Sequence, residues 1–237
     1  MFGPVGTTPY DLRFRLFGIP VTVIPWFWLA ALITGWQPSS RDYPDLLAIW
    51  IGCLFVSILV HEMGHALTAL AFGWPPQIYL YGFGGLAVYR PTSGRATGRS
   101  VLISFAGPAA GFVLYGLIFG LQQLIIPTAW FENLRPRTQL QIADFIGQMQ
   151  WINLRWGLVN LLPVLPLDGG RIAEALLTRF RPWDGPRLAA MLSVVVAGLV
   201  AIYFVTHRER YGTYPALLFG LLAFSNIQSL QEPRGPW

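Results

Sequence analysis

The fold of this 237-residue chain is decided by residues 49–65, which read IWIGCLFVSILVHEMGH. An uncharged, mostly apolar run leads directly into two histidines and a glutamate. The surrounding stretch Leu46–Trp74 exceeds the roughly 20 residues needed to cross the hydrocarbon core of a bilayer. Ionisable side chains are costly at that depth and are functional candidates by default. These residues therefore predict a membrane-spanning helix that carries a chemical site.

The composition of the whole chain also indicates a membrane protein. Apolar and aromatic residues (AVILMFWYC) make up 54% of the chain and charged residues 11%, whereas ordinary soluble domains carry about 25% charge. So few charges cannot cover a soluble globule, and so much apolar content excludes intrinsic disorder. The single cysteine, Cys53, excludes an internal disulfide. The net charge of +5 is attributed to arginines in cytoplasmic loops, which set the orientation of a membrane protein. No nucleic-acid partner is therefore expected.

Six apolar stretches approach the length of a membrane span. They are Ile19–Trp36, Leu46–Trp74, Val101–Ile126, Ile142–Leu167, Leu188–Thr206 and Tyr214–Leu230. We expect an α-helical multi-span membrane protein of the cell membrane, with about six transmembrane helices in one integral membrane domain over residues 1–237. Ten arginines against five on alternate sides favour cytoplasmic termini. Arg155 is left inside the fourth stretch, where it could snorkel, line a wet cavity or pair with an acid.

Two segments have the pattern of strands. Leu12–Ile24 alternates β-branched and aromatic residues, and Gln77–Arg90 reads as two short strands around Gly82, Gly84 and Gly85. A small membrane-associated β-hairpin or sheet is therefore expected. An exposed edge of Gln77–Arg90 could hold a substrate segment by β-augmentation, with Gly84 and Gly85 allowing close backbone approach. The alternative is a re-entrant hairpin that plugs a cavity.

The motif HEMGH at residues 61–65 has the spacing of a zinc-binding helix. Histidines at i and i+4 share one helix face, so His61 and His65 can reach one zinc ion. Glu62 is then placed to take a proton from a bound water. The alternative is a polar cluster that holds neighbouring helices together.

A catalytic zinc site needs a third protein ligand and a position open to water. The candidate is Asp168 in the segment NLLPVLPLDGG at residues 160–170, where Pro163 and Pro166 break the fourth span. Asp168 could turn toward a metal, or could only cap the following helix. Asn160 could face the same cavity as a donor to a developing oxyanion, or could only bond between helices.

The two motifs, in this order and spacing, resemble the site-2 protease family (peptidase family M50). These are zinc metalloproteases that cut peptide bonds within the membrane. Residues 83–85 (FGG) and 105–108 (FAGP) are similar to further motifs of the family. The resemblance covers a catalytic core at residues 46–170, so the fifth and sixth spans lie outside it and could gate lateral access of substrate.

The resemblance implies an intramembrane zinc endopeptidase with one Zn²⁺ per chain. Its substrate would be a transmembrane protein, surrounded by membrane lipid, and a regulatory membrane protein would be a further partner. The implied roles are general base for Glu62, substrate or oxyanion binding for Asn160, and zinc ligation for His61, His65 and Asp168. Neither the PDZ nor the CBS domain of some members is expected.

Two other classes of function compete with the protease. The first is a catalytically silent protein that keeps the zinc site and binds membrane helices, and the intact Glu62 argues against it. The second is a zinc carrier, which would need several acidic or histidine-lined sites along a pathway. With three histidines, the chain offers one compact site.

Overall fold

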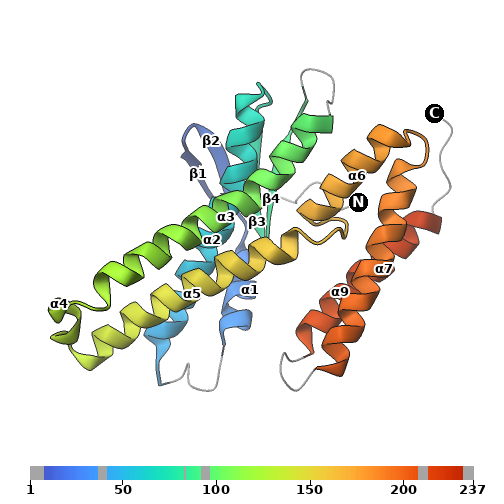
Figure 1. The fold of residues 1–237 in the computed structure, drawn as a ribbon. Helices are drawn as coiled ribbons and strands as arrows, with labels where there is room; N and C mark the ends of the chain where they lie inside the picture. Colours follow the sequence, from blue (N-terminus) through green and yellow to red (C-terminus); the bar gives the residue numbers. More distant parts are fainter. Residues whose placement is uncertain (1–7, 37–41, 83, 92–96, 208–212, 232–237) are drawn as a thin grey trace. The chain divides into compact units, whose positions relative to one another are not determined.

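The structure is a computed structural model that describes residues 8–36, 42–82, 84–91, 97–207 and 213–231 (Figure 1). Its chain forms two compact units. The first combines Met1–Gly94 with Ala106–Gly157, and the second combines Arg95–Phe105 with Leu158–Trp237. Phe83 of the FGG motif and both chain ends, on which the expected topology depends, lie outside the described residues.

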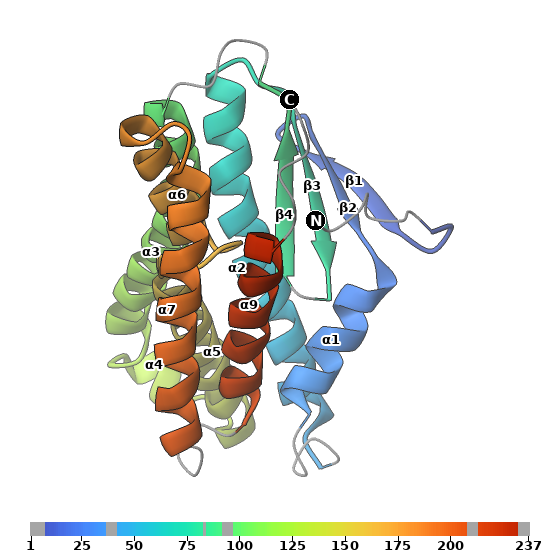
Figure 2. The same ribbon diagram turned by 90° about the vertical axis from the view of Figure 1, so that its right-hand side faces the viewer.

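A four-stranded sheet lies in the first unit, in the order β1-β2-β3-β4 (Figure 2). The pairs β1 (Leu12–Leu16) with β2 (Ile19–Val23) and β3 (Pro76–Tyr81) with β4 (Gly84–Tyr89) are antiparallel. Gln77–Arg90 is therefore a hairpin, as predicted, and the strand pattern of Leu12–Ile24 forms a second hairpin that the sequence did not predict. They join into one sheet through a parallel pairing of β2 with β3, which we had not predicted. Strand β4 is an edge of this sheet.

One face of the sheet packs against α2 (Pro44–Ala71), the helix that carries HEMGH. Alternation along β2 and β3 directs one set of β-branched and leucine side chains toward this helix. The buried residues that form this core include Ile19, Val21, Val23, Ile78 and Leu80 of the sheet and Ile58, Met63 and Ala66 of α2. The sheet thus lies directly beside the motif.

Helix α1 (Pro25–Gly35) is shorter than the first expected span, because Ile19–Val23 forms β2 instead. The β-branched residues of that segment favour a strand, and Pro25 at the first helical position suits a helix start. The apolar stretch Ile19–Trp36 is therefore part strand and part helix.

Three described helices are long and apolar enough to cross a membrane, namely α2, α3 (Thr97–Ile125) and α7 (Gly185–Thr206). They correspond to the second, third and fifth expected spans. Helices α5 (Pro136–Asn160) and α9 (Tyr214–Gln231) occupy the fourth and sixth stretches, and a short helix α4 (Ala129–Glu132) precedes α5. The number of six spans stays a prediction.

Polar side chains tie α2 to α5 at two levels of the first unit. Asn153 Nδ2 donates to Ser57 Oγ over 2.9 Å. Nearer the start of both helices, Asp45 accepts a hydrogen bond of 2.7 Å from Gln141 and pairs with Arg137. Hydrogen bonds between helices are a main source of specific association within a membrane.

Arg155 lies on the exposed side of α5. Its guanidinium carbon is 5.0 Å from the ring centre of Trp151, one helical turn earlier. This distance is typical of a cation–π contact. The structure therefore gives Arg155 an aromatic partner on its own helix, in addition to the three roles that the sequence left open.

The second unit contains α6 (Asp168–Phe180), α7 and α9 (Figure 1). Helices α7 and α9 pack along each other, and the non-helical residues 161–167 pack against both. Val164 is fully buried there, in a cluster with Ala197 of α7 and Phe219 of α9. The helix expected to follow Asp168 is present as α6, and it begins at Asp168 itself.

Gly64 lets α2 and α3 come into close contact, since a Cβ at this position would lie 2.4 Å from the carbonyl oxygen of Ala106. We expect Gly64→Ala to force the helices apart and lower the free energy of unfolding by about 1–3 kcal/mol, the usual cost of overpacking. Thermal unfolding in detergent measures the change. The control is Gly116→Ala in α3, where no described atom lies within 4 Å of the new Cβ. An equal loss in both variants would contradict this role of Gly64.

Candidate metal centre

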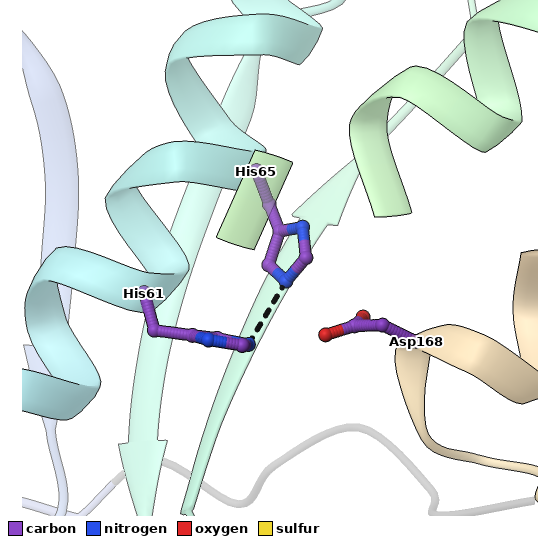
Figure 3. Close-up of side chains that lie close together, drawn as sticks. All are labelled: His61, His65 and Asp168. Atoms are coloured by element: carbon purple, nitrogen blue, oxygen red, sulfur yellow. Dashed lines mark hydrogen bonds between the residues drawn. The ribbon is translucent and has the colours of Figure 1, made fainter. Parts of the chain in front are cut away.

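His61 and His65 lie one turn apart on α2, and their imidazoles point toward the same place (Figure 3). Their Nε2 atoms are 3.2 Å apart, and both residues are buried. Two nitrogens bound to one tetrahedral zinc ion at about 2.05 Å would be about 3.3 Å apart. The spacing of the two imidazoles therefore fits a shared zinc ion.

Asp168 is the first residue of α6 and is also buried. The N-cap of this helix is Leu167, so Asp168 stands at the first helical position rather than at the cap position. A carboxylate in the first turn is stabilised by the partial positive charge of the helix N-terminus.

Gly169 and Gly170 allow α6 to begin in direct contact with the loop before it. A Cβ on Gly169 would lie 2.1 Å from the carbonyl oxygen of Leu161, and a Cβ on Gly170 would lie 2.4 Å from the amide nitrogen of Leu165. Any side chain at either position would therefore displace the start of the helix. The two glycines after Asp168 therefore let the first turn of α6, which carries Asp168, lie directly against the loop.

The ligand atoms of His61, His65 and Asp168 lie within 4.8 Å of one another (Figure 3), so the three residues could hold a metal ion. Two imidazoles and one carboxylate form a donor set typical of catalytic zinc sites, which leave one position open for water. The chemistry of the donors therefore fits zinc. Cys53 does not belong to this group: its Sγ is 3.8 Å from the Phe145 carbonyl oxygen on α5.

Glu62 is buried against the edge strand β4. A Cβ on Gly85 would lie 2.3 Å from Cγ and 2.5 Å from Oε1 of Glu62. Gly84 has a φ of 130°, which only glycine adopts readily, and a Cβ there would lie 3.1 Å from the indole of Trp156. Gly85 therefore brings the backbone of β4 against the carboxylate of Glu62, and Gly84 brings it close to Trp156.

Gly107 in α3 makes a contact that the sequence did not reveal, because its spacing of four residues from Gly111 (GxxxG) indicates only helix packing. A Cβ on Gly107 would lie 2.2 Å from Nε2 of His65. The missing side chain therefore leaves the space that the imidazole occupies. A search for small residues facing the HEMGH helix could have suggested this role.

Asn160 is the last residue of α5 and is buried. It lies at the point where the helix stops and the proline-containing loop begins. Its role as a donor to substrate stays a prediction.

Parts of this chain are similar to known proteins. The family model of Peptidase family M50 matches residues 135–204. The Synechocystis sp. protein sll0528 is 35% identical over 174 residues, which cover 68% of this chain and 42% of the relative. Zinc metalloprotease MJ0392 of Methanocaldococcus jannaschii is 29% identical over 175 residues, covering 72% and 46%. Residues 135–204 of this chain are therefore similar to peptidase family M50.

The fold of this chain is similar to that of a solved protein as well. The site-2 protease from Methanocaldococcus jannaschii matches with a TM-score of 0.63 at 22% sequence identity, covering 96% of this chain and 99% of that chain. At this identity the likeness concerns the fold alone. The chain spans less than half the length of the two curated relatives.

We expect Gly107→Ala to weaken zinc binding, because its Cβ would displace the His65 imidazole. The expected loss of affinity is at least about tenfold, as for other changes around a metal ligand. Competition with a chromophoric chelator measures it on purified protein. Gly111→Ala, one turn along α3, is the matched control, since its Cβ would lie 3.5 Å from the nearest atom, an ordinary contact. Unchanged affinity in Gly107→Ala would refute the prediction.

Proposed function

We propose that this chain is an intramembrane zinc endopeptidase that hydrolyses peptide bonds in or near the transmembrane segments of membrane proteins. The observation that carries the proposal is the buried group of His61, His65 and Asp168, with Glu62 next to His61. The match of residues 135–204 to the model of Peptidase family M50 and a relative named zinc metalloprotease support it. Three helices able to cross a membrane agree with a membrane location.

One zinc ion per chain would be held by His61, His65 and Asp168. Such an ion makes a bound water acidic enough to lose a proton near neutral pH. Glu62 accepts that proton and later donates it to the leaving amine. Asn160, through its side-chain amide, donates a hydrogen bond to the oxyanion that forms at the attacked carbonyl. All of these side chains are buried, where such interactions are strong because water does not compete.

The edge of β4 is the proposed binding surface for substrate. A transmembrane helix protects its own amides, so it has to unwind before hydrolysis. Among the described residues β4 pairs only with β3, and an unpaired edge can bind an extended segment. Because Gly85 lies against Glu62, a segment bound along this edge would lie next to the general base. Gly84 and Gly85 are therefore proposed as substrate-binding residues.

The proposed setting is a multi-pass protein of the cell membrane with both termini in the cytoplasm. Lipid surrounds the spans, and a separate membrane protein could regulate access of substrate. A catalytically silent protein that binds membrane helices is the second candidate. It retains the zinc site but cuts nothing.

We expect Glu62→Gln to keep about one zinc per chain and to lose cleavage by at least about 100-fold, because the amide cannot take a proton. Metal analysis of detergent-purified protein and digestion of casein, an unfolded protein, measure the two effects. Asp168→Ala is the companion variant, and it should bind zinc far more weakly as well as lose activity. Full activity in Glu62→Gln would exclude its role as base. Wild type that binds zinc but cuts neither casein nor co-reconstituted single-span proteins would favour the silent candidate.

We expect Gly85→Ala to abolish cleavage while zinc stays bound. The new Cβ overlaps the side chain of Glu62, so β4 or Glu62 has to move from its place. Gly82→Ala, in the turn before β4, is the control, because its Cβ would lie 3.4 Å from the nearest atom. Casein cleavage and zinc content are compared for both variants. Normal cleavage by Gly85→Ala would disprove the close fit of β4 to the active site.

A further inference from the structure

Two buried side chains of α7 and α9 hold the loop that leads to Asp168. Residues 161–167 leave the helical path after α5, so their backbone groups lose helical partners. At membrane depth each such group needs a partner within the protein. The N–H of Leu165 donates to Ser193 Oγ on α7 over 2.9 Å, and its carbonyl accepts from Asn226 Nδ2 on α9 over 2.8 Å. One residue of the loop is thereby held on both sides.

Both side chains are themselves oriented by their own helices. Ser193 Oγ donates to the carbonyl of Ala189 over 2.7 Å, which leaves its lone pairs for the N–H of Leu165. Asn226 Nδ2 also donates to the carbonyl of Leu222 over 2.8 Å. A hydroxyl has one hydrogen and an amide NH₂ two, so every donor hydrogen of the pair is used. Ser193 is 0% and Asn226 5% exposed.

Short contacts connect Leu165 to the first turn of α6. The N–H of Leu167 donates to the carbonyl of Val164 over 2.8 Å. Gly170 lies against the peptide between Val164 and Leu165, with no room for a Cβ. Val164 in turn is fully buried between α7 and α9. A shift of the Leu165 peptide would therefore move the start of α6 and the carboxylate of Asp168 with it.

We infer that Ser193 and Asn226 are positioning residues for the metal ligand Asp168. They act through the peptide of Leu165 rather than on the metal itself. Partners that orient a metal ligand typically contribute 10- to 100-fold in metal affinity. The inference rests on the proposed zinc site and adds α7 and α9 to the elements that support it.

The test is the zinc affinity of the purified full-length chain, measured by chelator competition with zinc alone. Ser193→Ala and Asn226→Ala should each raise the Kd by about 10- to 100-fold. They should also change the visible absorption spectrum of the cobalt-substituted protein, which reports metal geometry. The matched controls are Thr206→Ala, whose hydroxyl bonds the backbone at the end of α7, and Ser225→Ala on the exposed side of α9. Both should retain the wild-type Kd.

A double-mutant cycle separates positioning from general loss of stability. In an Asp168→Ala background, the Ser193 and Asn226 variants should cause no further loss of zinc affinity, because the carboxylate through which they act is gone. A further tenfold loss in that background would overturn the inference, and so would wild-type affinity in both single variants. Ser193→Cys keeps a weaker acceptor and should give an intermediate Kd, so it replaces Ser193→Ala if that variant does not fold. If the wild-type protein binds no zinc, the proposed zinc site itself is refuted.

Discussion

A polar group in the hydrocarbon core of a membrane needs a partner inside the protein, and this requirement governs the middle of α2. His61, Glu62 and His65 are ionisable, yet all three are buried in a helix apolar enough to span a bilayer. The histidines face each other at 3.2 Å, and Glu62 lies against β4. One turn earlier, Ser57 bonds to Asn153 of α5. The strand and helices around α2 thus surround its polar residues with protein rather than lipid.

Glycine makes these close contacts possible. Gly85 leaves room for Glu62, Gly107 for His65, and Gly64 for the backbone of α3. In each case a Cβ would approach a heavy atom to 2.4 Å or less, well inside ordinary contact. Helices in lipid associate through packing and hydrogen bonds rather than through apolar burial. Small residues at these positions therefore bring backbones close to the site and keep lipid away from it.

Local patterns predicted most of the elements that carry the chemistry. The alternation in Leu12–Ile24, the HEMGH spacing and the prolines after Asn160 each depend on neighbours in sequence, and the structure has strands, a helix and a helix end there. The parallel pairing of β2 with β3 joins segments more than 50 residues apart, for which no local pattern exists. The contact of Gly107 with His65 was missed for a similar reason, since a glycine in an apolar helix does not show which side chain it faces.

The contacts of Ser193 and Asn226 were likewise not predictable from local sequence patterns. They give the last two helices a part in supporting the loop before Asp168. In sequence Ser193 is a polar residue among apolar neighbours, and Asn226 lies in the more polar end of the last apolar stretch. Such residues are typical of helix pairs that bond to each other. In the structure both bond to the backbone of Leu165, three residues before Asp168. If α7 and α9 separated to admit a substrate, Leu165 would lose one of its two partners. A gate formed by these helices could therefore not open without loosening the support of Asp168, so access of substrate and metal geometry would change together.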